Sequence, residues 1–181
     1  MTEGEATEPQ YLNGLARYAR ATGLVVSTAS VFGIGRDPLS VVRRAVVLRD
    51  EDNSKNRSPR DRYESIWCVF DVDEHATIDA ALIEAQAEGF KVGVSNPCFE
   101  IWLLWHFEDH FAEISRKNLR NKLKPRGCGE KKIPRNFDYS KFQEASRRAR
   151  SRPSVKSDYS IPANPGTGVL SLVGAVMGGG T

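Results

Sequence analysis

Two aspartates, Asp71 and Asp73, end an apolar run and are the residues of this sequence best suited to bind a metal ion. Residues two apart on an extended backbone point to the same side, so their carboxylates lie about 6–7 Å apart along the chain. Carboxylates that close repel each other unless a proton or a cation intervenes. Mg²⁺ prefers oxygen ligands and keeps water molecules for a substrate phosphate, so we expect a Mg²⁺ site here, with Mn²⁺ as the alternative ion.

A helix dipole offers another explanation for two of the candidate acids. Asp73 precedes a helix expected to begin near Thr77, and Glu100 opens another predicted helix. An acid in either place is stabilised by the positive end of the helix without binding a metal. This explanation does not extend to Asp71. We therefore predict that Asp71 and Asp73 bind the ion, and that Glu100 is either an outer ligand or a first-turn acid.

Strands and helices alternate along the first 107 residues. Apolar residues recur there at helical spacing or in short strand-like runs, separated by turns that contain Gly or Pro. This alternation predicts an α/β sandwich in which helices flank a mostly parallel sheet. The expected helices are residues 7–22, 37–51, 78–87 and 99–107, and the expected strands are residues 24–32, 65–72 and 91–95.

Ligands of such sheets bind beyond the carboxyl ends of the strands. The residues in that position are 33–37, 71–74 and 96–100. Glu3 resembles a fourth residue of this kind, placed just past the end of a strand. A strand usually needs about five residues, but only two precede Glu3. We therefore expect either that the first strand is truncated or that the start of the chain has been assigned too late.

Positive charge is concentrated in one segment. Residues 116–156 contain 15 Lys and Arg against three acids, a net charge of +12, whereas the rest contains 11 against 20, a net charge of −9. Lys and Arg neutralise phosphates and release counterions, so the segment predicts contact with nucleic acid. The alternative is a solvated basic loop. The candidate phosphate contacts are Arg36, Lys141, Arg147 and Arg148.

Composition argues against several other classes of protein. No apolar run approaches the roughly 18 residues that cross a bilayer, and the acidic N-terminus is unlike a signal peptide. We expect a cytoplasmic protein without a membrane partner; the sequence does not indicate an oligomeric state. The three widely spaced cysteines suggest neither disulfides nor a zinc site. His106 and His110 adjoin phenylalanines, and we expect them to pack rather than to bind metal.

Several blocks of the sequence resemble the RloB-like family. Residues 3–11 read Glu-Gly-Glu-Ala-Thr-Glu-Pro-Gln-Tyr, residues 69–74 read Val-Phe-Asp-Val-Asp-Glu, and residues 95–104 read Ser-Asn-Pro-Cys-Phe-Glu-Ile-Trp-Leu-Leu. His106-Phe107 follows the third block, and the tail Asn-Pro-Gly-Thr at 164–167 precedes an apolar stretch. The block that begins Ser-Asn-Pro-Cys-Phe-Glu is the most distinctive of these.

The resemblance extends over nearly the whole chain and implies one domain over residues 1–181. Within it we expect a basic, partly irregular insertion at 116–160 and a C-terminal helix at 164–177 that packs back on the core. The RloB-like family is similar to Toprim domains, the metal-binding fold of topoisomerases, primases and overcoming-lysogenization-defect nucleases. The resemblance therefore implies a Toprim/Rossmann-like sandwich.

The resemblance also implies cleavage or transfer at a phosphodiester, with Glu3, Asp71 and Asp73 as the acids. It implies a place in bacterial phage defence by abortive infection, near restriction–modification genes and often beside an ATPase. We expect a Mg²⁺-dependent nuclease for DNA or RNA, with Glu3 as a further ligand or as the general base. Glu100 completes the candidate catalytic set.

Two other functions remain open at this point. The first is a non-catalytic nucleic-acid-binding or regulatory subunit that partners an ATPase. The short segment before Glu3 favours it, because catalysis requires an acid held within about 0.5 Å. The second is a nucleotidyl-transfer enzyme, which would use the same acids but needs a nucleotide pocket. The sequence contains no P-loop to provide one.

Overall fold

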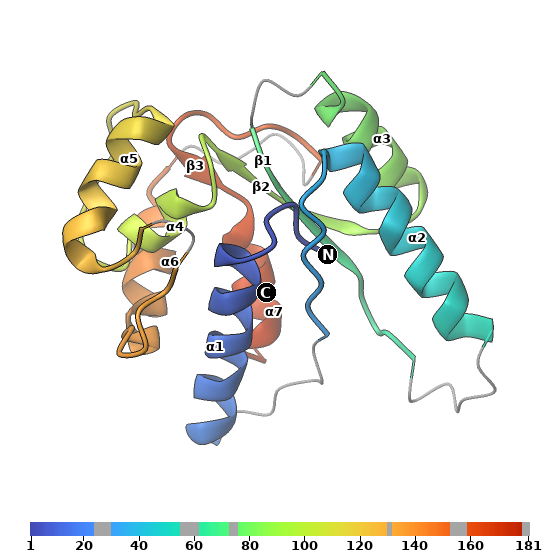
Figure 1. The fold of residues 1–181 in the computed structure, drawn as a ribbon, viewed down its shortest axis with the longest axis horizontal. Helices are drawn as coiled ribbons and strands as arrows, with labels where there is room; N and C mark the ends of the chain where they lie inside the picture. The colour runs from blue at the N-terminus through green and yellow to red at the C-terminus, as the bar shows by residue number, and fades with distance from the viewer. Residues whose placement is uncertain (24–29, 55–61, 73–75, 130–131, 153–158, 179–181) are drawn as a thin grey trace.

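The computed structural model of the protein describes residues 1–23, 30–54, 62–72, 76–129, 132–152 and 159–178. These residues form seven α-helices and a small sheet of three strands with mixed directions, which confirms an α/β fold (Figure 1). The helices are α1 (Thr7–Ala21), α2 (Pro38–Ser54), α3 (Ile78–Ala87), α4 (Glu100–Leu104), α5 (Arg116–Leu123), α6 (Phe142–Arg150) and α7 (Val169–Val176). The strands are β1 (Trp67–Asp71), β2 (Lys91–Asn96) and β3 (Gly166–Thr167).

The sheet places the end of β1 beside the end of β2. These two strands are parallel and pair Asp71 with Ser95, whereas β3 runs antiparallel to β2 and pairs Thr167 with Ser95. The two hydroxyl oxygens of that second pair lie 2.8 Å apart. Parallel pairing means that the chain leaves β1 and β2 at the same edge of the sheet, where the candidate acids were expected.

The N-terminal residues extend the parallel arrangement, although they are too few to form a regular strand. Thr2 makes parallel bridges to Gly33 on one side and to Val69 on the other. The amide of Glu3 donates to the carbonyl of Val69 at 2.8 Å, and the amide of Gly35 donates to the carbonyl of Glu3 at 2.9 Å. Backbone hydrogen bonds therefore hold Glu3 from both sides, so the short segment before it does not leave it frayed.

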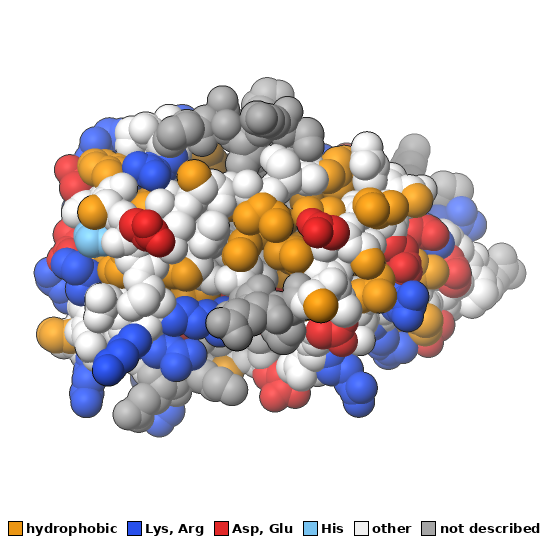
Figure 2. All heavy atoms as spheres, turned by 90° about the horizontal axis from the view of Figure 1, so that it is seen from above, with side chains coloured by type: hydrophobic (Ala, Val, Ile, Leu, Met, Phe, Trp, Pro, Cys, Tyr) orange, Lys and Arg blue, Asp and Glu red, His pale blue; other side chains and the backbone are white. Residues whose placement is uncertain are grey.

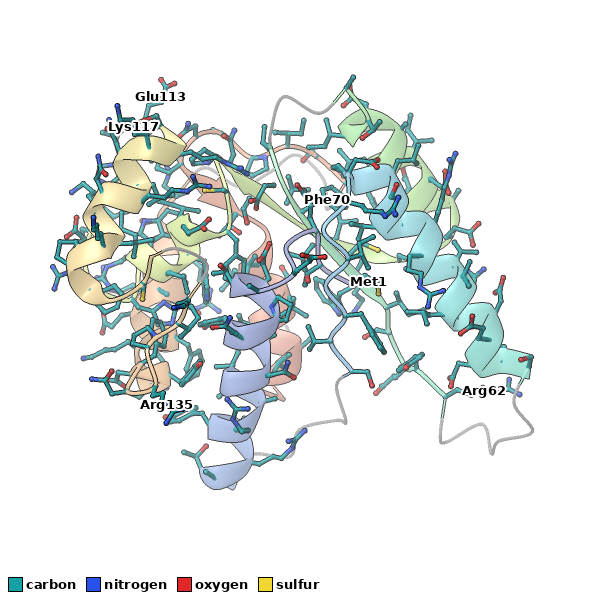
Figure 3. The ribbon with its side chains drawn as sticks, in the orientation of Figure 1. Met1, Arg62, Phe70, Glu113, Lys117 and Arg135 are labelled. Carbon is teal, nitrogen blue, oxygen red and sulfur yellow. The ribbon has the colours of Figure 1, made fainter. Side chains whose placement is uncertain are left out.

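Helices cover both faces of the sheet because successive strand residues point to opposite sides. Cys68 and Phe70 of β1 pack against α2 and α3, whereas Val69 packs with α1, α4 and α7 on the other face. Figure 3 shows Met1 and Phe70 near the centre of the molecule, between these two layers, and Arg62 and Arg135 at its periphery. Strand β1 is accordingly apolar from Trp67 to Phe70, as is usual when both faces of a sheet are buried.

Three elements differ from the sequence-based expectation. The expected strand 24–32 lies largely outside the described residues, although Phe32 accepts a hydrogen bond from the amide of Thr2. Helix α4 ends at Leu104 rather than at Phe107, and the amides of His106 and Phe107 bond three residues back, which tightens the last turn. The apolar run predicted as a helix over residues 99–107 therefore extends beyond α4. Its residue Trp105 is apolar because it is buried, not because the helix continues. Strand β3 was not expected.

The basic segment contains regular structure among its described residues. Helix α5 is followed by the 3₁₀ turn η2 (Lys124–Arg126), and the turn η3 (Tyr139–Lys141) leads into α6. Helix α7 buries Val169, Leu172 and Val173 in the larger core. None of the helices in the described ranges combines the length and apolar character that crossing a bilayer requires.

Candidate metal centre

Asp71 is the last residue of β1, and its buried carboxylate is fixed by two donors. Oδ1 accepts a hydrogen bond from the backbone amide of Phe99 at 2.8 Å, and Oδ2 accepts one from Nη2 of Arg116 at 2.9 Å. The residue is only 9% exposed. The first donor lies just before α4 and the second begins α5, so three elements meet at this carboxylate.

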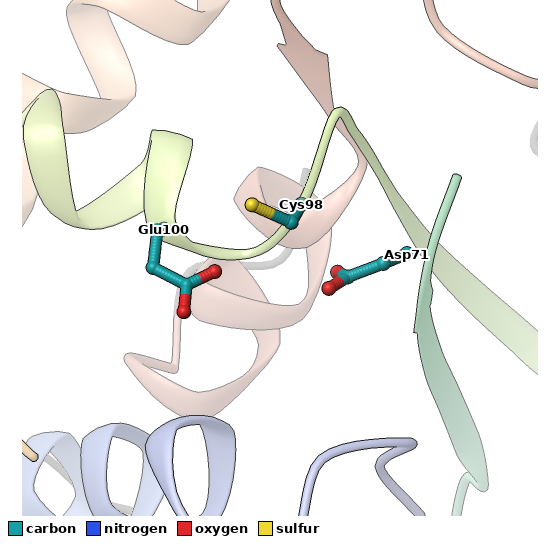
Figure 4. A group of neighbouring side chains, drawn as sticks. All are labelled: Asp71, Cys98 and Glu100. Carbon is teal, nitrogen blue, oxygen red and sulfur yellow. The ribbon is translucent and has the colours of Figure 1, made fainter. Parts of the chain in front are cut away.

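Asp71, Cys98 and Glu100 form a group that could hold a metal ion. One ligand atom from each residue lies within 4.8 Å of the other two. Figure 4 shows the carboxylates of Asp71, from β1, and Glu100, from the start of α4, pointing toward each other, with the sulfur of Cys98 nearby. Asp71 ends β1 and Glu100 lies just past the end of β2, so these residues come from two neighbouring strand ends at one edge of the sheet.

Two further carboxylates join this group from the N-terminal segment. Oε2 of Glu3 accepts a hydrogen bond from the backbone amide of Asp71 at 3.1 Å. Glu8 lies in the first turn of α1, and its Oε1 accepts a hydrogen bond from the amide of Gly4 at 3.1 Å. Glu8 is 5% exposed, which is unusual for a helix-start acid. We call Glu3, Glu8, Asp71 and Glu100 the acidic group.

Burial and mutual repulsion raise the pKa values of acids in this group. The pKa of Asp71 lies well above its usual range, first because burial disfavours the charged form and then because Glu8, Glu100 and Glu3 repel it; Arg116 opposes the shift. The pKa of Glu8 is raised for the same reasons, with burial as the largest cause. A bound cation would reverse this balance by favouring the ionised carboxylates.

Cys98 behaves as a neutral thiol in this setting. Burial is the main cause that raises the pKa of its thiol, and the neighbouring charges of Glu100 and Asp71 add to it. The thiol also lies within hydrogen-bonding reach of Glu100. A neutral thiol can orient that carboxylate, whereas a thiolate ligand would suit a softer ion than Mg²⁺. The donor set is therefore mainly oxygen, which fits a hard divalent cation.

Not all of the predicted site residues enter the group. Asp73 lies outside the described residues, so its assignment as a ligand stays a prediction. Arg36 is exposed in the turn after Gly35, and Lys141 is exposed at the end of η3. Arg148 makes an ion pair with Asp109. The contact of Arg36 and Lys141 with phosphate stays a prediction.

Arg147 and Arg148 have partners within the protein. Arg147 lies 3.4 Å from Glu144 and 3.5 Å from Asp109. Arg148 pairs with Asp109 and also donates to the carbonyl of Trp105. Its side chain is only 12% exposed. Arg148 is therefore largely engaged within the protein, whereas the exposed ion pairs of Arg147 contribute little to stability. Contact of either arginine with nucleic acid stays a prediction.

Sequence reasoning missed two residues of the centre. No sequence pattern singled out Glu8, and Arg116 is only one of 15 cations in the basic segment. The pairing of Arg116 with Asp71 spans 45 residues, and no local pattern signals it. The burial of Glu8 could have been suspected from Gly4, because Glu8 packs against the position where a side chain at residue 4 would lie.

Strand ends, flanking helices and a carboxylate-rich group define an α/β protein with a candidate metal centre. The family model described as RloB-like protein matches residues 1–176, so the chain belongs to the RloB-like family. This confirms the resemblance found in the sequence. No curated protein and no solved structure matches the chain significantly.

Proposed function

We propose that this protein is a metal-dependent nuclease that hydrolyses phosphodiester bonds in DNA or RNA, with Mg²⁺ as its ion. The observation that carries the proposal is the convergence of four carboxylates at the carboxyl end of β1. Such a group is unfavourable for the folded protein in its ionised form, because burial and repulsion both oppose its charge, and a bound cation would offset that cost. Natural proteins retain unfavourable groups of this kind mainly at functional sites.

The acids of this centre are suited to different roles. Asp71 and Glu100 approach each other from different elements and are suited to hold the ion, with Asp73 as a further candidate ligand. A divalent ion there would polarise a phosphate oxygen and offset negative charge that develops on it. Glu3 is held against the backbone of Asp71, so it is suited either to be a further ligand or to accept a proton.

The hydrolysis balances with these residues. The oxygen of a water molecule bonds to phosphorus while the bond from phosphorus to the leaving sugar oxygen breaks. A carboxylate of the acidic group, for which Glu3 is the candidate, takes the proton from the water. The leaving oxygen receives a proton from solvent. Arg116 lies next to Asp71 and is suited to stabilise the negative charge of the phosphate.

We also propose that the fold is Toprim-like and that the protein acts in bacterial phage defence, with an ATPase as a partner. The support for the fold is that residues 1–3, β1 and β2 run parallel with helices on both faces. The defence role and the partner follow only from membership of the RloB-like family.

A cleavage assay with Asp71→Asn tests the nuclease proposal. The asparagine keeps an oxygen to accept from the amide of Phe99 but loses the charge that binds the ion. We expect cleavage of labelled single-stranded DNA or RNA with Mg²⁺ to fall by at least about 100-fold. Glu113→Gln is the matched control, because Glu113 is an exposed acid before α5 (Figure 3). Equal activity of Asp71→Asn and wild type would reject the mechanism.

One observation favours a second candidate, a non-catalytic nucleic-acid-binding or regulatory subunit. Arg116 lies 2.9 Å from Oδ2 of Asp71 and supplies positive charge where a metal ion would otherwise do so. A protein of this kind would bind nucleic acid without cleaving it. Nucleic-acid binding by the wild type, together with no cleavage in Mg²⁺ or Mn²⁺, would support this candidate over the nuclease.

A further inference from the structure

Helix α5 carries a row of cations that begins at the acidic group. Arg116, Arg120 and Lys124 are spaced four residues apart, and Lys124 keeps helical backbone angles at the end of α5. Residues with this spacing lie on one side of a helix, about 6 Å apart along its axis. Because Arg116 contacts Asp71, the row leads from the acidic group along the helix.

A cavity lies beside this row. It has a volume of about 270 Å³, and its lining includes Arg120 and Lys124 together with Lys132 from the loop after η2. Glu100 and Thr7 line the cavity as well. Glu100 therefore belongs both to the acidic group and to the wall of this cavity. The volume is close to the lower end of the range for small-molecule pockets, about 300 Å³. We call Arg120, Lys124 and Lys132 the cationic groove.

Other cations of the same region are paired with an acid. Nζ of Lys122 lies 2.7 Å from Glu108, and Nη2 of Arg126 lies 3.5 Å from Glu108. Arg126 also lies over the ring of Phe107. By contrast, within the described ranges no ion pair joins an acid to any of the three side chains of the cationic groove. Figure 2 shows several Lys and Arg side chains at the end of the molecule that holds α5.

We propose that the cationic groove binds the phosphates of a nucleic-acid strand next to the phosphodiester that reaches the acidic group. The inference rests on the proposed nuclease function, since it assigns a binding site to the same substrate. Exposed cations that pair with no acid among the described residues are available to neutralise phosphates, and doing so releases counterions. The shared Glu100 places this phosphate site directly beside the candidate metal centre.

The groove recognises the backbone rather than the bases. Lys and Arg contacts to phosphate fix the position of a strand but carry no sequence information. The proposal therefore implies binding that is independent of sequence and strongly dependent on salt. For a single strand, each neutralised phosphate contributes about 0.7 to the slope of log K against log salt concentration.

Binding of the full-length chain to fluorescein-labelled single-stranded DNA and RNA of mixed sequence tests the proposal. Fluorescence anisotropy in EDTA measures affinity without cleavage and without dependence on metal. The test variant is Arg120→Gln with Lys124→Gln. The control is Lys122→Gln with Arg126→Gln, which removes the same charge from the same region. All four residues are exposed, and thermal melting checks that both variants fold.

We expect the test variant to bind at least tenfold more weakly, with a salt slope shallower by about 1.4, since two phosphate contacts are lost. The control should stay within about twofold of wild type. Equal weakening of the two variants would overturn the groove, as would failure of the wild type to bind. A wild type that binds through the groove but does not cleave in Mg²⁺ would reject the nuclease function alone.

Discussion

The acidic group and the cationic groove hold charge in opposite ways. The acids are drawn from the N-terminal segment, β1, α1 and α4, and they are at least partly buried with their charges close together. The cations lie on the exposed surface of α5 and the loop that follows it. Burying like charges costs free energy, whereas exposing charge costs little.

This difference determines what each region can reveal about function. The acidic group requires an explanation by its energetics alone, because the folded chain would be more stable with fewer charges there. Exposed cations require no such explanation. Lys122 forms an ion pair with Glu108, and only this ion pair distinguishes it from Arg120. The buried region therefore supports a metal centre directly, and the exposed region supports nucleic-acid binding through the contrast between two sets of cations.

The largest predicted effect is at Glu100, the residue that both regions share. Glu100→Gln should lower Mg²⁺-dependent cleavage by at least about 100-fold, because changes even to groups outside the ligand shell cost 10–100-fold. It should leave nucleic-acid affinity in EDTA unchanged or slightly higher, since a negative charge leaves the groove. Steady-state assays measure the cleavage rate, and fluorescence anisotropy measures the nucleic-acid affinity. Loss of binding with retained cleavage would show that the assignment of Glu100 is wrong.

A second prediction compares the acidic group with a buried base on the same side of the sheet, packed between α1 and α4. The ring of His106 is hydrogen-bonded to the carbonyl of Trp102 and to the hydroxyl of Tyr11, and burial lowers the pKa of His106 to about 4. As the pH falls, the unfolded chain, with a histidine pKa of about 6.5, takes up a proton on this histidine before the folded chain does. Stability from neutral His106 is therefore complete above pH 6.5 and is lost as the pH falls toward 4.

The size of this loss is about 3 kcal/mol of unfolding free energy. It is measured as the difference between wild type and His106→Gln in urea unfolding at pH 7.5 and at pH 4.5. The raised pKa of Asp71 acts in the opposite direction, because a buried acid is destabilising once it ionises. Asp71 is present in both proteins, so subtracting the unfolding free energy of His106→Gln from that of the wild type removes its contribution. If this difference in unfolding free energy is the same at pH 7.5 and pH 4.5, the prediction is wrong.

A third prediction concerns Arg116, which contacts the acidic group from α5. Arg116→Gln should increase the Mg²⁺ affinity of the centre about tenfold, because the guanidinium competes with the ion for Oδ2 of Asp71. Arg116→Lys keeps the charge and is the matched control, which should stay closer to wild type. Calorimetry measures both. Weaker Mg²⁺ binding in Arg116→Gln would mean that the arginine positions Asp71 rather than competing for it.

The smallest predicted effect is at Cys98. If the thiol only orients Glu100, Cys98→Ser should change Mg²⁺ affinity by less than about twofold, because a hydroxyl can donate the same hydrogen bond. Affinity for Cd²⁺, which prefers sulfur, provides the contrast. A large loss of Mg²⁺ affinity would assign the residue to the ligand shell.

Local patterns predicted the framework but not the long-range contacts. The apolar runs of β1 and β2 and the helical spacing in α1, α2 and α3 identified those elements, and strand-end position identified Asp71 and Glu100. Strand β3 has only two residues, too few for any periodicity. The contact between Arg116 and Asp71 and the burial of Glu8 depend on how distant segments pack.

The most direct test of the account is a calorimetric titration of Mg²⁺ into the wild type and into Asp71→Asn. The acidic group predicts one site for each wild-type chain, with an affinity that rises with pH as the carboxylates lose their protons. It also predicts that the site disappears in Asp71→Asn, while both proteins melt as folded chains. Absence of binding to the wild type, or equal binding to the two proteins, would contradict the assignment of a metal centre.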